Sequence, residues 1–248
     1  MPSHDAAGMV AKLDRTFYPD CEDHWDSKIF AKKIKALLRP NFCVLDLGAG
    51  RGALRHLDMR QPDVHVCGSD IDAAVEDNQQ IDAGRVIDAD GRIPWEDETF
   101  DLAFSSFVWE HVENPRHFLG EVRRVLKPGG TYLAQTPSSR HYVAAAARLT
   151  SYGFHKKFNA LRGRDEVDTF PTFYRLNSRS TIERAARAAG LDVVGIEFIE
   201  KRPEYLRISP LTYLPGIAWE RLVNLDPRLE SLRASIIATV QKPQTGNP

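Results

Sequence analysis

The sequence lacks several features that mark particular classes of protein. No apolar run approaches the roughly 20 residues that cross a bilayer as a helix, so we expect no stable membrane insertion. The formal net charge of −1 gives no global basic field for nucleic acid, and we expect no nucleic-acid partner. The three cysteines are scattered and form no Cys-x-x-Cys or Cys/His cluster, which predicts no metal and is typical of a reduced, cytoplasmic protein.

What is present is a regular alternation of short apolar segments with helical patterns. Strands are predicted at residues 43–48, 65–72, 84–90, 100–107 and 131–137. Helices are predicted at residues 24–38, 53–60, 73–81 and 114–130, the last ending in Pro-Gly-Gly. This alternation predicts βαβ units and a parallel sheet, so a ligand is expected at the carboxyl ends of the strands.

After residue 137 the pattern becomes irregular. Residues 138–177 are basic and aromatic, and residues 203–233 are a second unusual stretch. Between and after them we predict a helix at 178–190 and strands at 191–201 and 234–242. We interpret 138–177 and 203–233 as insertions over one end of the sheet.

A glycine-rich turn follows the first strand, in the stretch "VLDLGAGRG". Its third glycine comes one residue too early for the G-x-G-x-x-G dinucleotide fingerprint, and no P-loop motif is present. A purely structural turn is the alternative on this motif alone. Asp46 lies within the apolar strand, where a buried acid must be paired or hydrogen-bonded. Asp70 ends the second strand about 20 residues after the turn, the offset at which an acid binds ribose hydroxyls.

Four motifs in order, "VLDLGAGRG", "VCGSDID", "IDADGRIPWEDETFDLAFSSFVWEHV" and "FLGEVRRVLKPGG", resemble the class I S-adenosylmethionine-dependent methyltransferases, in particular their small-molecule, type 11-like subgroup. The resemblance implies an α/β fold with a doubly wound, mostly parallel seven-stranded sheet in the order 3-2-1-4-5-7-6, with an antiparallel last strand and helical cap insertions. It implies one methyltransferase domain over residues 1–248. The parts of this domain are a helical segment covering the cofactor (1–39), a cofactor-binding half (40–137), a cap insertion (138–177) and a C-terminal half (178–242) that contains the second insertion (203–233).

The resemblance also implies which residues hold S-adenosylmethionine and its product S-adenosylhomocysteine. They are Asp46, Gly48, Ala49, Gly50, Gly52, Asp70, Ile71, Asp88, Ala89, Ser105, Phe107 and Tyr18. Asp70 would bind the ribose hydroxyls, and Ile71 would lie against the adenine. Ala89 occupies the place where the family usually has the acid that accepts from the adenine amino group, so either Asp88 or Asp90 takes that role.

For the chemistry we expect in-line transfer of a methyl group to an oxygen or nitrogen of a small-molecule acceptor, which includes glycan and lipid precursors. A general base is needed for a hydroxyl or ammonium nucleophile, and the candidates are His111, His141 and His155. The stretch "FVWEHV" resembles metal-dependent ubiquinone-pathway O-methyltransferases, but Phe107 replaces their first glutamate, so no metal site is expected. Glu110 and His111 can instead tie the loop after the fourth strand to a helix.

The expectations about binding partners come from the sequences of the two insertions. Residues 138–177 hold seven Arg and Lys against three acids, which favours an anionic group on the acceptor, with a solvated loop as the alternative. The apolar segment 211–225 is a lid, a homodimer surface within 203–233, or a lipid-facing helix.

Three other functions compete with a small-molecule methyltransferase. An RNA or protein methyltransferase would need a base-flipping loop or binding appendage, and the loop "SSFVWEH" offers neither. The intact glycine turn and Asp70 speak against a non-catalytic cofactor-binding or scaffold protein. An aminopropyltransferase-like enzyme would need an acidic polyamine pocket, which is not evident in the sequence.

Overall fold

A computed structural model describes residues 4–21, 25–144 and 170–244 of the 248-residue chain. The chain divides into two compact units. The sheet unit comprises residues 29–137, 171–197 and 236–248, and the helical unit comprises residues 1–28, 138–170 and 198–235.

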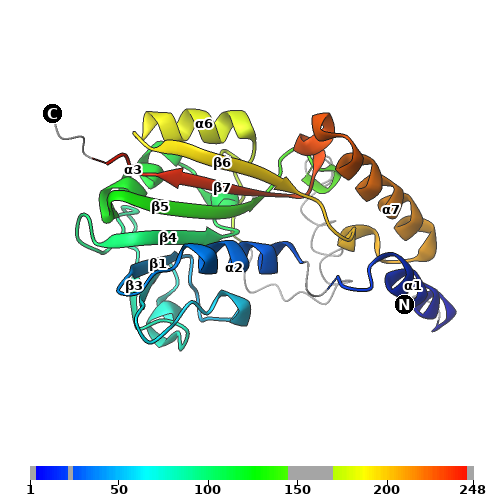
Figure 1. Cartoon of the computed structure of the whole chain (residues 1–248), viewed down its shortest axis with the longest axis horizontal. Helices are drawn as coiled ribbons and strands as arrows, with labels where there is room; N and C mark the ends of the chain where they lie inside the picture. Colours follow the sequence, from blue (N-terminus) through cyan, green and yellow to red (C-terminus); the bar gives the residue numbers. More distant parts are fainter. Residues whose placement is uncertain (1–3, 22–24, 145–169, 245–248) are drawn as a thin grey trace. The chain divides into compact units, whose positions relative to one another are not determined.

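The sheet unit is built on seven strands in the order β3-β2-β1-β4-β5-β7-β6 (Figure 1). The strands are β1 (Cys43–Leu47), β2 (His65–Asp70), β3 (Ala83–Val86), β4 (Phe100–Ser106), β5 (Leu126–Pro137), β6 (Asp192–Ile199) and β7 (Ser235–Gln241). β1 lies between β2 and β4 and is parallel to both. Beside β7, the Gly129 N–H donates to the Lys242 carbonyl and the Lys242 N–H donates to the Gly130 carbonyl, both at 2.9 Å. The strand order and the antiparallel last strand confirm the fold that the sequence predicts.

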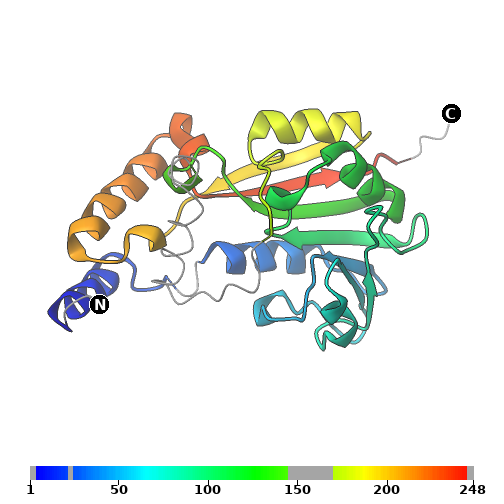
Figure 2. The same cartoon turned by 180° about the vertical axis from the view of Figure 1, so that it is seen from behind.

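In the described part of the chain, three α-helices cover the sheet: α2 (Asp26–Leu37), α3 (Pro115–Val125) and α6 (Arg179–Ala188). Figures 1 and 2 show α2 on one face and α3 with α6 on the other. Phe30 of α2 packs edge-on against Phe104 of β4, and both are fully buried. α3 begins where the Asn114 side chain accepts from the His117 N–H, and Ser178 and Thr181 form a capping box at the start of α6. Local capping and apolar spacing therefore explain where these helices begin.

The helices predicted at 53–60 and 73–81 are wrong. Only the short 3₁₀ turns η1 (Arg55–Leu57) and η2 (Ala73–Asp77) form there. Asp58 accepts from the Arg60 N–H at 3.1 Å, and Asp72 accepts from the Ala74 N–H at 2.9 Å. Such side-chain bonds to nearby backbone compete with a helix, and the short connections leave little length to overcome them.

The helix predicted at 114–130 is also shorter than expected. α3 ends at Val125, and Leu126-Lys-Pro-Gly-Gly belongs to β5. The carbonyls of Arg124 and Val125 accept from the N–H groups of Glu98 and Thr99, at 2.9 and 2.8 Å. Neighbouring backbone thus satisfies these terminal carbonyls, and Pro128 has no N–H with which to extend the helix.

The helical unit contains α1 (His4–Phe17) and α7 (Pro210–Leu225), which lie side by side (Figure 1), with the 3₁₀ turns η5 (Glu204–Leu206) and η6 (Pro227–Leu232). Val10, Tyr213 and Ile217 form its apolar core. Asp14 accepts from the Tyr213 hydroxyl at 2.6 Å and forms an ion pair with Arg207 at 2.7 Å. Among the described helices, none has the length and apolar character needed to cross a membrane.

Candidate cofactor and acceptor site

The glycine turn is packed closely at both ends and open in the middle. Gly48, Gly50 and Gly52 have φ angles of +81°, +46° and +74°, a region that L-residues rarely adopt. A Cβ on Gly48 would lie 2.4 Å from Val108, and a Cβ on Gly52 would lie 2.3 Å from Asn78. Near a Cβ on Gly50, the described structure has only the Asp70 carboxylate, at 3.8 Å. The backbone at Gly50 can therefore be approached closely by a ligand.

Asp70 lies beside this opening because β1 and β2 are parallel neighbours. Its Oδ2 accepts from the Gly50 N–H at 2.8 Å, and its Oδ1 accepts from the Asp72 N–H at 2.9 Å. A carboxylate oxygen has two lone pairs, so each oxygen keeps a place for a ligand hydroxyl. Ile71 follows with 61% of its surface exposed, so an apolar side chain lies next to this acid in the sequence. This pair suits a ribose joined to a flat apolar ring.

The carboxyl group of Asp46 has a raised pKa beside this site. Burial, and secondly the nearby Asp70 carboxylate, raise the pKa of Asp46 from 3.8 to about 8. Within the described residues no hydrogen bond or ion pair reaches its carboxyl group, so the expectation that this acid is paired is wrong. Asp46 is only partly buried, and a carboxyl group that lies near a second carboxylate can avoid the cost of an unpaired charge by staying neutral.

The loop that carries the predicted adenine contacts is exposed at its tip. Asp88, Ala89 and Asp90 all lie at the surface. Asp90 already accepts from the Arg92 N–H at 2.9 Å, so its carboxylate helps to form the turn itself. This bond favours Asp88 over Asp90 as the acceptor for an adenine amino group, which stays a prediction.

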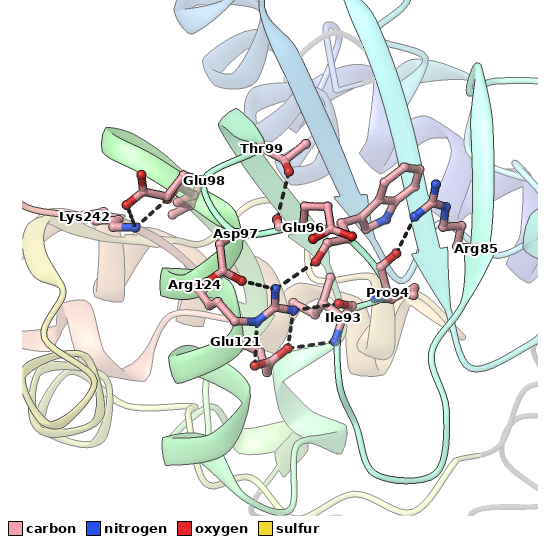
Figure 3. A network of polar contacts seen from close by, with 12 residues as sticks. Arg85, Ile93, Pro94, Glu96, Asp97, Glu98, Thr99, Glu121, Arg124 and Lys242 are labelled. Carbon is pink, nitrogen blue, oxygen red and sulfur yellow. Dashed lines mark hydrogen bonds and ion pairs between the residues drawn. The ribbon is translucent and has the colours of Figure 1, made fainter.

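Arg124 of α3 anchors the other end of this loop, as Figure 3 shows. Its guanidinium donates to the carbonyls of Ile93 and Trp95 at 2.7 and 2.8 Å and forms ion pairs with Glu121 and Asp97. Glu121 in turn accepts from the Ile93 N–H at 3.0 Å. These bonds hold the pKa of Glu121 below its ordinary value despite its partial burial. The loop is thus fixed to a helix that is itself packed on the sheet.

Sequence reasoning missed Trp95, which joins this loop to β2. Its indole N–H donates to the Ser69 hydroxyl at 2.8 Å, and the Arg85 guanidinium lies 3.9 Å from its ring centroid. Ser69 directly precedes Asp70, so the bond connects the loop to the predicted ribose-binding position. The sequence signal for this role was the position of Trp95 in the motif "IPWEDETF". A buried tryptophan usually finds a hydrogen-bond partner for its indole N–H, so a contact between this motif and another segment could have been predicted.

The residues after β4 are divided between the interior and the surface. The Ser105 hydroxyl lies 2.6 Å from the Tyr132 hydroxyl, which also accepts from the Trp109 indole N–H at 2.9 Å. The Ser105 side chain is therefore engaged in the interior. Phe107 is exposed at a φ of +56°, and its N–H donates to the Gln135 carbonyl at 2.8 Å. The side-chain amide of Gln135 is fully buried with no hydrogen-bond partner in the described part of the chain.

Glu110 and His111 tie the loop after β4 to residues 171–174. His111 lies in the 3₁₀ turn η3 (Trp109–His111), and its Nδ1 is 2.8 Å from the Pro171 carbonyl oxygen. A carbonyl only accepts, so Nδ1 carries the proton and Nε2 is the basic nitrogen of the neutral ring. The Glu110 carbonyl accepts from the Phe173 N–H at 2.7 Å, and burial raises the pKa of its carboxyl group. The two residues thus tie this loop to the irregular segment 171–174 and not to a helix, as the sequence had suggested for their alternative role.

The remaining candidates lie in the helical unit or outside the described residues. His141 is buried, with its Nε2 3.4 Å from Glu200 Oε2. The Tyr18 hydroxyl donates to Glu220 Oε2 at 3.0 Å. Sequence reasoning missed both glutamates, since neither belongs to a motif. His155 and most of the basic residues of 138–177 lie outside the described residues. In residues 4–21, 25–144 and 170–244, no group of three or more His, Cys, Asp or Glu side chains is placed to hold a metal.

Comparison with known proteins matches the chain to a family described as methyltransferase domain, over residues 23–196. The chain is 30% identical over 108 residues to the sterol 4-C-methyltransferase of Caenorhabditis elegans, which is 40% of this chain and 32% of that protein. It is 32% identical over 95 residues to a malonyl-[acyl-carrier protein] O-methyltransferase of Coxiella burnetii, which is 38% of this chain and 33% of that protein. The matched segments thus span about a third of these relatives.

One solved structure illustrates the shared fold. It is a complex of a methyltransferase with the Trm112 methyltransferase activator of Haloferax volcanii, whose matched chain has a TM-score of 0.58 at 20% identity, with 100% of both chains covered. At this identity the likeness shows the fold alone. The family match over residues 23–196 confirms the resemblance that the four sequence motifs indicate.

Proposed function

We propose that this chain, which belongs to the family of methyltransferase domains, transfers a methyl group from S-adenosylmethionine to a small-molecule acceptor. The relatives are matched over only about a third of their length, so their names serve only as support for a proposal about the acceptor of this chain. The observation that carries the proposal is the opening at Gly50 beside Asp70.

The residues around this opening fit the cofactor. Asp70 presents carboxylate lone pairs to a ribose diol, and Ile71 presents an exposed apolar side chain to an adenine ring. The turn has no Cβ at Gly50, so the methionine part of the cofactor can lie against its backbone. Asp88 would accept from the adenine amino group, and Phe107 would line the sulfonium end.

S-adenosylmethionine supplies an activated methyl group on a sulfonium. The acceptor lone pair forms the new bond to the methyl carbon as the carbon–sulfur bond breaks, and S-adenosylhomocysteine leaves. The chain therefore has to align the acceptor in line with that bond and keep water out, and neither task requires a covalent intermediate. If the acceptor is a hydroxyl or an ammonium, its proton passes to a base on the chain.

His111 is the base that the described geometry supports best. The bond from Nδ1 to the Pro171 carbonyl places the proton of the neutral ring on Nδ1, so Nε2 is the nitrogen that would take up a proton from the acceptor. His141, held beside Glu200 in the helical unit, is the second candidate, because a carboxylate partner stabilises an imidazolium. His155 is the third candidate and lies outside the described residues.

Two observations bear on the chemical class of the acceptor. The names of the two relatives refer to a sterol carbon and to a malonyl oxygen, which supports a lipid or acyl precursor and leaves open which acceptor atom is methylated. The excess of Arg and Lys in residues 138–177 favours an anionic group on the acceptor. We therefore favour a small lipid or acyl precursor with an anionic group.

We also propose a homodimer formed through residues 203–233. α7 exposes four leucines (Leu211, Leu214, Leu222 and Leu225), and the outer two are 87% and 83% exposed. A stripe of this kind on a soluble surface marks an interaction site.

The test of the function has two steps. Titration calorimetry with S-adenosylhomocysteine is expected to show one site per chain. Incubation with S-adenosylmethionine carrying a radiolabelled methyl group, against a panel of sterols, quinols, acyl thioesters and phospho-amines, is expected to label one class. If S-adenosylhomocysteine does not bind, the proposal is wrong; if it binds and no class is labelled, the small-molecule acceptor is wrong.

A further inference from the structure

Asn78 holds the carbonyl side of the glycine turn. Its side-chain N–H₂ donates to the Ala49 carbonyl at 3.1 Å and to the Gly50 carbonyl at 3.2 Å. Asn78 is buried, with only 5% of its surface exposed. An amide has two N–H hydrogens, so one side chain satisfies two neighbouring carbonyl groups.

Gln80 adds a second side-chain amide to the contacts that hold the turn. The Gln80 N–H donates to Asn78 Oδ1 at 2.8 Å, which fixes the orientation of the Asn78 amide. The Gln80 side-chain N–H₂ donates to the Gly52 carbonyl. The carbonyls of Ala49, Gly50 and Gly52 are therefore all bound by the segment that follows η2.

This arrangement replaces a helix. The helix predicted after the turn at 53–60 is absent, so no helical backbone continues from the turn and holds it. Glycines with positive φ sample many backbone conformations when nothing restrains them. Asp70 restrains the turn from its N–H side, through Gly50, and Asn78 restrains it from its carbonyl side. Gly52 is part of the same arrangement, because a Cβ there would collide with Asn78 Oδ1.

We propose that Asn78, oriented by Gln80, is a positioning residue that presets the glycine turn to receive S-adenosylmethionine. The inference rests on the proposed function, because it assigns the turn to that cofactor. Asn78 would act on the cofactor indirectly, through the peptide groups of Ala49 and Gly50 that its side chain holds. A preset turn loses less conformational freedom on binding, so the cofactor binds more tightly.

Two substitutions separate positioning from packing. Asn78→Asp keeps the shape and the acceptor for the Gln80 N–H but turns a carboxylate oxygen toward two carbonyl oxygens. Near pH 7.5 this change is expected to weaken S-adenosylhomocysteine binding by at least about tenfold. Near pH 5.5 the substituted carboxyl group is expected to be protonated, because burial and the carbonyls disfavour its charge, and to donate again. The ratio of variant to wild-type Kd should therefore fall as the pH is lowered.

Asn78→Leu fills the same space without any hydrogen bond, and its affinity loss is expected to be the same at both pH values. Gln80→Leu is a milder variant, because it removes the bond to the Gly52 carbonyl and keeps Asn78, and its expected loss of affinity is about three- to tenfold. Gln79→Leu, at an exposed neighbouring position, is the matched control and should bind as the wild type does.

Each result of the calorimetry has a distinct meaning. A pH-dependent loss for Asn78→Asp with a pH-independent loss for Asn78→Leu supports the inference. Wild-type affinity in Asn78→Leu and Gln80→Leu overturns it and leaves the proposed function intact. Equal losses for Asn78→Asp at both pH values, matched by equal losses of thermal stability, also overturn it and indicate a packing role. No binding by the wild type overturns the proposed function itself.

Discussion

Arg124 and Glu121 form a two-point ion pair one helical turn apart on α3. Arg124 Nε donates to Glu121 Oε1 at 2.9 Å, and Arg124 Nη2 donates to Glu121 Oε2 at 2.6 Å. Both residues also bind the backbone of Ile93, which lies on the loop that carries Asp88 (Figure 3). The pair therefore links the stability of the loop to a helix away from the proposed cofactor opening.

Arg124→Lys is expected to destabilise the chain although it keeps the charge. Lysine is a point donor and cannot replace a planar fork that binds two carboxylates and two carbonyls at once. Loss of these bonds to a mostly buried group costs about 1–3 kcal/mol in the free energy of unfolding. Urea unfolding measures this change. Arg116→Lys, on the exposed face of the same helix, is the control, and an equal effect of both substitutions would contradict a special role for Arg124.

Asp70→Ala is expected to weaken S-adenosylhomocysteine binding about 10- to 100-fold. The change removes a charged acceptor for a ribose diol and also releases the Gly50 N–H, and hydrogen bonds to charged groups contribute about 1.5–3 kcal/mol. Titration calorimetry measures the loss. Asp77→Asn on η2 removes a charge at an exposed position nearby and should leave the affinity unchanged. Unchanged affinity in Asp70→Ala would remove the ribose assignment.

Asp46 is expected to make both stability and cofactor binding depend on pH. Its pKa is about 8 in the folded chain and 3.8 ordinarily, so the folded chain keeps a proton that the unfolded chain releases. The contribution of Asp46 to stability is therefore fully present below about pH 4 and is lost as the pH rises through about 8. Asp46→Asn should flatten this dependence in urea unfolding.

The same group is expected to couple to the sulfonium charge. A cation near Asp46 favours its ionised form, so binding of S-adenosylmethionine should release a proton and strengthen several-fold from about pH 6 to about pH 8. S-adenosylhomocysteine lacks the sulfonium charge and should show a smaller change. A flat profile for S-adenosylmethionine in the wild type would place Asp46 outside the cofactor site.

His111 can be tested as a base without breaking the tie that it makes. His111→Gln keeps an N–H₂ group that can donate to the Pro171 carbonyl but cannot take up a proton near neutral pH. If His111 is the base, turnover with the acceptor found by screening should fall about 10²–10⁴-fold in His111→Gln with little loss of thermal stability. A fall only in His111→Ala, together with a lower Tm, would show that the residue has the tying role alone. His141→Gln would then be examined in the same way.

The proposed dimer surface can be tested by sedimentation. Leu211→Glu combined with Leu225→Glu places two charges on the exposed side of α7 and should leave only monomer. Leu211→Gln with Leu225→Gln keeps the helix and lowers the apolar area without charge, so its dimer should weaken and not vanish. A monomeric wild type would exclude this dimer.

The sheet could be predicted from the sequence because its signals are local. Alternating apolar strands, the glycines at 48–52 and the Pro-Gly-Gly stop indicated parallel units, and the family resemblance supplied the strand order. The helices predicted at 53–60 and 73–81 were wrong, because Asp58, Asp72 and Asn78 bind nearby backbone groups. The spacing of apolar residues does not show that such bonds compete with a helix.

Only those residues of the candidate site that belong to a sequence motif could be predicted. Asp70 lies beside the glycine turn as expected, because two parallel neighbouring strands bring residues about 20 apart in sequence together. Asn78, Arg124 and Glu200 were missed, because each acts through contacts between segments that are distant in sequence. Pairing of Asp46 was predicted from the cost of burying a charge, and the structure instead favours the neutral acid.

The position of β7 has a consequence for synthesis on the ribosome. Among the described strands, β6 lies at the edge of the sheet, neighbours only β7, and is separated from β5 by β7. A chain emerging from the ribosome can assemble the sheet from β3 to β5 first, since these strands are made early. β6 then has to wait, with its hydrogen-bonding groups open, until residues 235–241 have been translated and can slide between two strands that already exist. The last described strand thus closes the sheet from within.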